Sequence, residues 1–432
     1  MRARLRRLLL ELSEAFWVLP AAIVLVLAGL GLLVVDLQLE GDIAHGPLHD
    51  WVYGGGETGA RTLLGAVASS TIGVAGTLFS ITIAALSLAS SQMGPRLLRN
   101  FVRDRGNQIT LGVLLGTFAY ALVVLRSVRG GANDAFVPAL GVTVALALSG
   151  ACIGLLIYFV HHVATRINVD TVIDLVHDDI DREIDRLTEP RSERRPPPAE
   201  MDWTGADEVR LEGSGYLQQI DAAGLAKWAA DAGTTVRLLI RPGAFVFPGA
   251  TVALVKPRAP GAAEAIREAT ALSPRAGGGG DLVYSILQLV EVAVRALSPG
   301  INDPRTAISV LDRLGAILGR LVDRDLRDGV VRHADAPRLL IPSPAYGDLT
   351  GAMFAMIRQS AGHSPTVLLH MLGVLRAVAE IETRAERIEA LRQVAAEVAE
   401  EGRGRISNPC DVHALDAAHR AFLTTAAARC AG

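Results

Sequence analysis

The chain has 432 residues, of which 50% are hydrophobic and only 20% are charged, and its mean hydropathy is +0.34. Soluble globular domains carry about 25% charged residues, so the composition argues against two or three ordinary soluble domains. Three cysteines are too few for a disulfide framework. A net charge of −3 provides no general attraction to nucleic acid, and we expect no nucleic-acid partner.

Residues 1–165 are expected to form a transmembrane domain of four helices, with the lipid bilayer as its first partner. A spanning helix needs about 20 mostly apolar residues, and no uncharged run of that length follows position 165. The qualifying stretches are Phe16–Val35, Thr62–Pro95, Ile109–Val128 and Phe136–Val160. No convincing cleavage site follows the first stretch, which favours an uncleaved helix over a signal peptide.

The distribution of arginine predicts the orientation of these spans. Arginines gather in the N-terminal tail and after the second span, whereas the loop between the first two spans is acidic. Because basic loops stay on the cytoplasmic side, we expect both termini and everything from Arg166 onward to be cytoplasmic. The four arginines after the second span either only determine topology or also form a surface for lipid head groups or other anions. They are Arg96, Arg99, Arg103 and Arg105.

The predicted fold class is an α-helical polytopic membrane domain followed by a cytosolic α+β region. Residues 166–202 are expected to form an acidic amphipathic helix and a Pro-rich linker. Short β-branched runs between glycines and prolines predict a small β-barrel or sandwich at 203–257. Residues 258–280 are expected to be a flexible linker, and 281–432 a helical module. Its expected helices are Asp281–Leu297, Asp303–Val322, Gly347–Gln359, Pro365–Val378, Glu382–Glu401 and Cys410–Arg429.

The second span is the most informative segment. Its 34 uncharged residues would extend about 50 Å as a helix, against a hydrocarbon core of about 30 Å, so the helix tilts, extends past the surface or breaks. Small or hydroxylated residues recur on one face, which favours close helix packing or a water-lined path in an oligomer. These residues are Ser69, Gly73, Gly76, Ser80, Ala84, Ser87 and Ser91.

A polar corner in the helical module is the second candidate site. In the string SPGINDPRTA, Gly300 ends one helix, Asp303 caps the next and Pro304 takes its first position, which describes an architectural corner. Asn302 and Arg305 exceed what a turn requires. The alternative is therefore a pocket for a small anionic or nucleotide-like ligand, formed by Ser298, Asn302, Asp303, Arg305, His363, Ser364 and Arg376.

We expect no metal, no cofactor and no catalytic activity. His45 and His49 lie near two aspartates, but Gly46-Pro47 prevents a helical pair of metal ligands. Neither a nucleophile elbow nor a P-loop nor a dinucleotide fingerprint is present. The β module has no lysine at a hairpin tip that would carry a covalent cofactor.

The segments FSITIAALSLASSQMGPRLLRNF (Phe79–Phe101) and EVAVRALSPGINDPRTAISVLDRL (Glu291–Leu314) resemble a bacterial family of predicted membrane proteins, DUF2254. GYLQQID and the RPGAFVFPG turn also occur in the expected order. The resemblance implies an integral membrane protein of the cell envelope, and it implies no activity or catalytic residues.

These observations favour an oligomeric channel-like or transport protein of the bacterial inner membrane, with a cytosolic region that gates or senses. Spans with polar faces enclose a path only by pooling subunits, so we expect a homo-oligomer, with a small anionic ligand or ion as its other partner. The leading alternative is a membrane-anchored sensor or scaffold for envelope maintenance without conduction. A membrane-bound enzyme ranks third.

Overall fold

The computed structural model describes residues 16–40, 52–93, 104–130, 136–166, 169–191, 201–274 and 281–431. The chain divides into two compact units, Met1–Thr171 and Val172–Gly432.

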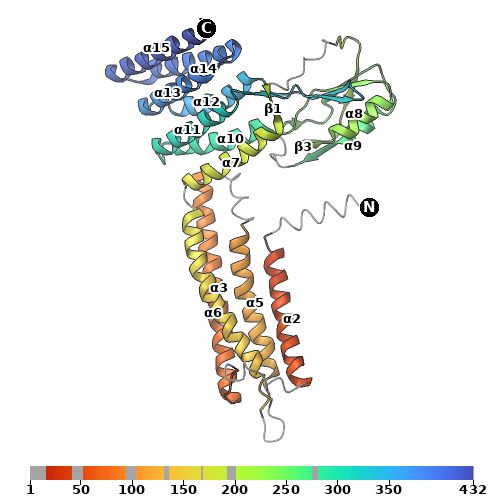
Figure 1. The fold of residues 1–432 in the computed structure, drawn as a ribbon, viewed down its shortest axis with the longest axis vertical. Coiled ribbons are helices and arrows are strands. Elements are labelled where there is room, and N and C mark those ends of the chain that lie inside the picture. The colour runs from red at the N-terminus through yellow and green to blue at the C-terminus, as the bar shows by residue number, and fades with distance from the viewer. Residues whose placement is uncertain are drawn as a thin grey trace. The chain divides into compact units, whose positions relative to one another are not determined.

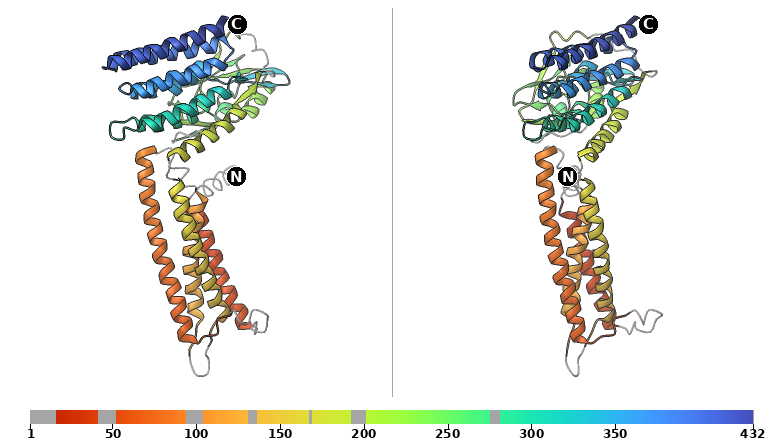
Figure 2. Two further views of the ribbon diagram at one scale, coloured as in Figure 1. Left: turned by 60° about the vertical axis from the view of Figure 1, so that its left-hand side comes forward. Right: turned by 90° about the vertical axis from the view of Figure 1, so that its left-hand side faces the viewer.

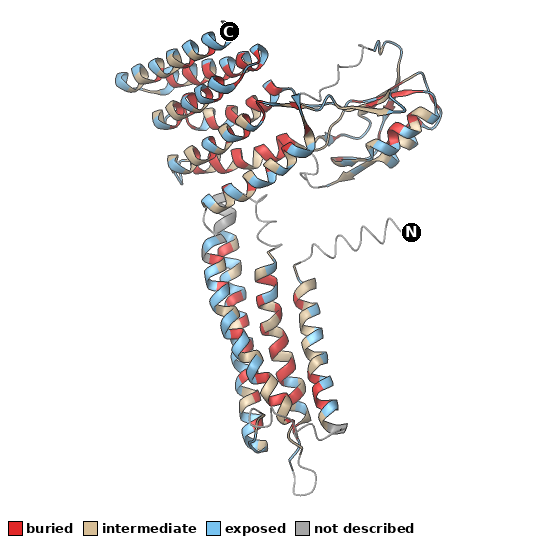
Figure 3. Ribbon diagram, viewed as in Figure 1, coloured by how far each residue is buried: buried red, intermediate tan, exposed pale blue. Residues whose placement is uncertain are grey.

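The described part of the N-terminal unit contains four helices that run beside one another (Figure 1, Figure 2). They are α2 (Val18–Glu40), α3 (Glu57–Met93), α5 (Arg105–Ser127) and α6 (Ala139–Arg166). All four are long and apolar enough to cross a membrane, so the four expected spans are helices of the required length and composition. Helix α5 contacts the other three and is the most buried of them (Figure 3).

Helix α3 is uninterrupted over 37 residues. At a rise of about 1.5 Å per residue it is about 55 Å long, well beyond a hydrocarbon core of about 30 Å. Of the three outcomes expected for this long span, the break is therefore excluded. The helix must tilt or extend past the bilayer surface.

Glycines on α5 allow α2 to approach it closely. A Cβ atom at Gly112 would lie 2.8 Å from Cδ1 of Ile23, and one at Gly116 would lie 2.5 Å from Cδ1 of Leu27. Small residues permit such contacts between membrane helices. The G-x-x-x-G pair at Gly150 and Gly154 makes no such contact, since a Cβ atom at either position would meet nothing within 4 Å.

The second unit begins with most of helix α7 (Val169–Leu187), which has an apolar face and an acidic face. Ile173, Val176, Ile180 and Ile184 are buried on the apolar face, as their helical spacing predicts. Residues 167 and 168, between α6 and α7, lie outside the described residues.

In the described part of the second unit, the strands form two open sheets and a short two-stranded ladder. The larger sheet has the order β2-β6-β4-β10-β9, and only β4 and β10 pair in parallel. The smaller sheet has the order β5-β3-β7, and β1 pairs with β8. The strands are β1 (Thr188–Pro190), β2 (Asp207–Arg210), β3 (Gly215–Ile220), β4 (Thr235–Leu238), β5 (Phe245–Val246), β6 (Thr251–Lys256), β7 (Thr270–Ser273), β8 (Arg324–Leu326), β9 (Val330–His333) and β10 (Ala336–Leu340).

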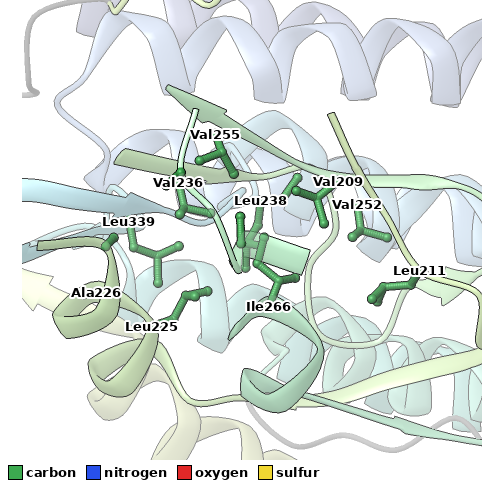
Figure 4. Close-up of a cluster of buried hydrophobic side chains, with 14 of the residues drawn as sticks. Val209, Leu211, Leu225, Ala226, Val236, Leu238, Val252, Val255, Ile266 and Leu339 are labelled. Carbon is green, nitrogen blue, oxygen red and sulfur yellow. The ribbon is translucent and has the colours of Figure 1, made fainter. Parts of the chain in front are cut away.

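The core of the β region joins segments that are distant in the sequence. Leu225 of α8 (Ala222–Asp231) and Ile266 of α9 (Ala262–Ala269) pack with Val236, Leu238 and Leu339 of the larger sheet (Figure 4). Because neither sheet closes on itself, the described strands form no closed barrel. They also extend beyond 203–257, because β8, β9 and β10 come from the region expected to be helical, and the expected linker at 258–280 contains α9 and β7.

Six further helices match the six expected from the sequence. They are α10 (Leu282–Ala296), α11 (Pro304–Arg320), α12 (Tyr346–Ser360), α13 (Pro365–Ile381), α14 (Ala385–Arg405) and α15 (Pro409–Ala431). Apolar residues at helical spacing bury one side of each inner helix, as Val310, Leu314 and Ile317 do on α11.

Candidate functional sites

The small-residue face of α3 is not covered by any other described part of the chain. Ser69, Gly73, Gly76, Ser80, Ala84 and Ser87 are all exposed, and the side chain of Ser91 lies outside the described residues. The packed face of α3 carries Leu64, Val67, Ala75 and Leu78, which are buried against the neighbouring helices. A Cβ atom at Gly73 or Gly76 would meet nothing within 4 Å. We call these seven residues the small face of α3.

Two hydroxyl groups of this face, those of Ser69 and Ser80, have acceptors within their own helix. Ser80 Oγ donates to the carbonyl of Gly76 at 3.0 Å, and Ser69 Oγ donates to that of Ala66 at 3.2 Å. The neighbouring Thr77 Oγ1 donates to the carbonyl of Gly73 at 3.1 Å. Because each donor is satisfied, these hydroxyls tolerate a dry protein neighbour and still offer lone pairs to water.

The predicted basic surface is described only at its end. Arg96, Arg99 and Arg103 lie outside the described residues, and Arg105 is the exposed first residue of α5. The preceding residue has a structural role that the sequence did not reveal. Asp104 Oδ1 accepts from the backbone N–H of Asn107 at 3.2 Å and lies 2.8 Å from Nε2 of His162 on α6. This contact joins the start of α5 to α6.

At the corner between α10 and α11, Asp303 caps α11 and Pro304 takes its first position, as the sequence predicts. The prediction that Gly300 ends the preceding helix is wrong, because α10 ends at Ala296 with Leu297 as its C-cap. Asp303 Oδ1 accepts from the backbone N–H groups of Arg305 and Thr306, and Oδ2 accepts from Thr306 Oγ1 at 2.6 Å. These bonds, above all that from Thr306 Oγ1, hold the pKa of Asp303 below its usual range. Ser298 Oγ donates to the carbonyl of Arg295, while Asn302 and Arg305 are exposed.

The remaining members of the expected pocket lie on or just before α13. Helices α11 and α13 run side by side in the same direction, since His370 Nε2 lies 2.6 Å from Asp312 Oδ1 and Gly315 faces Val374 one turn further on. The start of α13, with exposed His363 and half-buried Ser364, therefore lies at the same end as the corner.

Arg376 does not share that end. It lies twelve residues after Ser364, about 18 Å along the helix, and pairs with Glu380 at 3.3 Å.

A buried ionic cluster is the feature that sequence reasoning missed. Arg384 and Arg387, at the start of α14, face Asp325 and Glu382, and none of the four side chains is more than 9% exposed. Arg384 donates to the carbonyl of Val322 at 2.6 Å, and Arg387 donates to that of Leu321 at 2.7 Å. These carbonyls lie at the C-terminal end of α11, where helix acceptors lack partners. Burial lowers the pKa of Arg387. In the sequence, Glu382, Arg384 and Arg387 stand among many other charged residues, and nothing in their spacing indicates that they are buried.

The second unit also contains a cavity of about 1470 Å³. Its walls come from the end of α7, strands β1, β3 and β9, the start of α10, and the segments that flank β8 and β10. Its charged lining residues are Glu189, Arg241, Asp281, Arg327, Asp328 and Arg332. None of the seven residues of the expected pocket lines it.

No group of three or more His, Cys, Asp or Glu side chains in the described part of the chain is arranged to hold a metal ion. His45 and His49 lie outside the described residues.

Comparison with known proteins shows which family and which relatives the chain is similar to. The model of a family described as "Predicted membrane protein (DUF2254)" matches residues 13–377. Uncharacterised proteins of Mycobacterium tuberculosis and Mycobacterium bovis are each 34% identical over 394 residues, which cover 87% of this chain and 74% of each relative. No solved structure matches the chain.

Proposed function

Because the chain belongs to the DUF2254 family of predicted membrane proteins, we propose that it is a channel-like or transport protein of the bacterial inner membrane. It assembles as a homo-oligomer, both of its termini are cytoplasmic, and residues from Arg166 onward gate or sense. The distribution of arginine around the spans supports this orientation. The proposal includes no catalytic activity.

The exposed small face of α3 is the observation that carries this proposal. One side of α3 packs on α5 and α6, and the other side presents glycine, alanine and serine that no described residue of the same chain covers. In a bilayer, such a face lets a second backbone approach closely, and its hydroxyls offer water a path without fixed charge. The interior of the single bundle is filled by Leu64, Tyr120 and Val124, so a path requires several copies.

The satisfied hydroxyls favour a second candidate. Since Ser80 and Thr77 donate to their own helix, the small face can pack dry between subunits. The protein would then be a membrane-anchored sensor or scaffold for envelope maintenance, in which the spans only anchor and assemble.

Reconstitution into liposomes distinguishes the two functions. We expect the wild-type protein to release entrapped K⁺, and Ser80→Leu and Ser87→Leu to reduce that release sharply, because a bulky side chain narrows the path. Ala22→Leu, at an exposed position of α2, is the matched control and should conduct normally. Wild-type liposomes as tight as empty ones would favour the scaffold. Full conduction by both serine variants would show that the small face does not line the path.

A further inference from the structure

We propose that the cavity of the second unit binds an organic anion through Arg241 and Arg327. Binding at this site requires no conduction. Its assignment as the input that the cytosolic region senses does rest on the proposed function.

The cavity is large for a small-molecule site. Ligand pockets commonly measure roughly 300–1000 Å³. At about 1470 Å³, this cavity has room for a molecule of nucleotide size together with bound water. Ile220, Val331 and Ile341 provide apolar wall against which a carbon skeleton can pack.

Two of the cavity's carboxylates are already engaged by the protein. Asp281 Oδ1 caps α10 by accepting from the backbone N–H of Val283 at 3.1 Å. Asp328 Oδ1 accepts from the backbone N–H of Val330 at 2.9 Å, and its Oδ2 lies 3.8 Å from Nη2 of Arg332. These acids therefore have less capacity to neutralise the remaining guanidinium groups.

Of the three arginines that line the cavity, Arg241 and Arg327 are the two without an ion pair to a described residue. Neither guanidinium group makes an ion pair or hydrogen bond with a described residue. Arg241 does lie close enough to Asp281 to lower the pKa of that carboxyl, against the larger rise that burial causes. A guanidinium group presents a planar fork of donors that matches the oxygens of a carboxylate or phosphate. Two such forks in one cavity favour an anion with several oxygens.

The carboxylate of Glu189 narrows the class of anion that fits the cavity. This carboxylate also has no partner among the described residues, and it lies in the same cavity wall. A bare inorganic anion would be repelled by this carboxylate, whereas an organic anion can direct a hydroxyl or amino donor toward it. The chemistry thus points to an anion that also carries hydrogen-bond donors, as nucleotides do.

The position of the site links it to the helix that follows the membrane spans. Leu187 is the last residue of α7 and lines the cavity, and its carbonyl accepts from the backbone N–H of Arg327 at 3.3 Å. A ligand held by Arg327 therefore acts on the segment that ends α7. If α7 has two arrangements, the ligand shifts the equilibrium between them by as much as its affinity for the two differs.

Calorimetry on the full-length protein in detergent tests the site. The probes are ATP, pyrophosphate and citrate, which separate phosphate from carboxylate and organic from inorganic anions. We expect ATP or citrate to bind more tightly than pyrophosphate, and Arg241→Gln or Arg327→Gln to weaken that binding about tenfold to hundredfold. Arg267→Gln is the control, because Arg267 is 67% exposed, pairs with Glu264 alone among the described residues and lies outside the cavity.

Two results would overturn the proposal: no binding of any probe to the wild-type protein, or affinities unchanged in the Arg241/Arg327 double variant. Neither depends on ion flux. Binding without conduction would reject the channel and keep the site, and conduction without binding would do the reverse.

Discussion

At the scale of single residues, the buried pair Arg384 and Arg387 is the most consequential arrangement in the second unit. The two guanidinium groups satisfy carbonyls at the end of α11, and Asp325 and Glu382 balance their charges. The ring of Tyr346 lies 4.5 Å from the guanidinium carbon of Arg387, which adds a cation–π contact. The cluster therefore joins α11, α12, α14 and β8 through charges that are removed from water.

Removing one member of this cluster should destabilise the protein strongly. Arg387→Met leaves Asp325 and Glu382 buried with one cation, so we expect the free energy of unfolding to fall by about 3–5 kcal/mol. Arg392→Met is the control on the same helix, since its pair with Glu389 is exposed and should contribute only about 0–1 kcal/mol. Denaturant titration in detergent, followed by circular dichroism, measures both. Equal losses in the two variants would contradict the assignment.

At the scale of elements, α7 is attached by more than its apolar face. Arg313 of α11 lies 2.7 Å from Asp174, and Arg320 lies within 3.4 Å of Asp181 and Asp185. These pairs are partly exposed, and each contributes little by itself. Together they explain why a helix with so many acidic residues lies on the helical module: its charges meet arginines along one side of α11.

Glu183 makes the packing of α7 dependent on pH. Burial raises the pKa of this carboxyl above its unfolded value, although Ser285 Oγ donates to its Oε2 at 2.6 Å. A carboxyl with a raised pKa stabilises the fold fully below its unfolded pKa. That contribution is lost as the pH rises through the folded pKa, because the charged form must then be buried.

Glu183→Gln should therefore become more stable relative to the wild-type protein as the pH rises from about 4 to about 8. Glutamine keeps an acceptor for Ser285 and never takes a charge. Melting temperatures of the two proteins across this range measure the effect, and Asp178→Asn, at an exposed position of α7, controls for the loss of a charge alone. A difference that does not change with pH would contradict the role of Glu183.

At the scale of the whole molecule, the glycines of the membrane helices fall into two groups: some lie in helix contacts within the chain and others lie on exposed surfaces. Gly112 and Gly116 bring α2 against α5, whereas Gly73 and Gly76 on α3 are left uncovered. A protein that uses small residues inside its bundle and leaves others exposed on a membrane helix has a surface suited to a second copy.

Gly73→Leu should disrupt assembly without unfolding the chain. A Cβ atom at this position meets nothing within 4 Å, so leucine fits the single bundle but prevents close approach of another helix. Analytical ultracentrifugation in detergent should show the wild-type protein at a multiple of 45.6 kDa and the variant at lower mass. Ala22→Leu is the control. A monomeric wild-type protein, or an unchanged oligomer in Gly73→Leu, would contradict the proposed assembly.

Only part of the candidate sites could be predicted from the sequence. The capping of α11 by Asp303 follows from residues within four positions of one another, so this cap was predictable, whereas the end of α10 was not placed correctly. The cavity was not, because its walls combine residues near 187, 218, 241, 281, 327 and 342. The cluster around Arg387 depends likewise on a contact with Asp325, which lies 62 positions earlier.

The sequence by itself determined the four membrane spans, the amphipathic α7 and the six later helices. Hydropathy and helical periodicity are properties of neighbouring residues, and they need no knowledge of what each helix packs against. Only the tertiary structure decided that β10 joins β4 across about a hundred positions and which glycine pair packs within the bundle. It also decided which arginines are buried and which lack a partner among the described residues. These are outcomes of contact between distant segments, where burial and pairing depend on partners that no local pattern identifies.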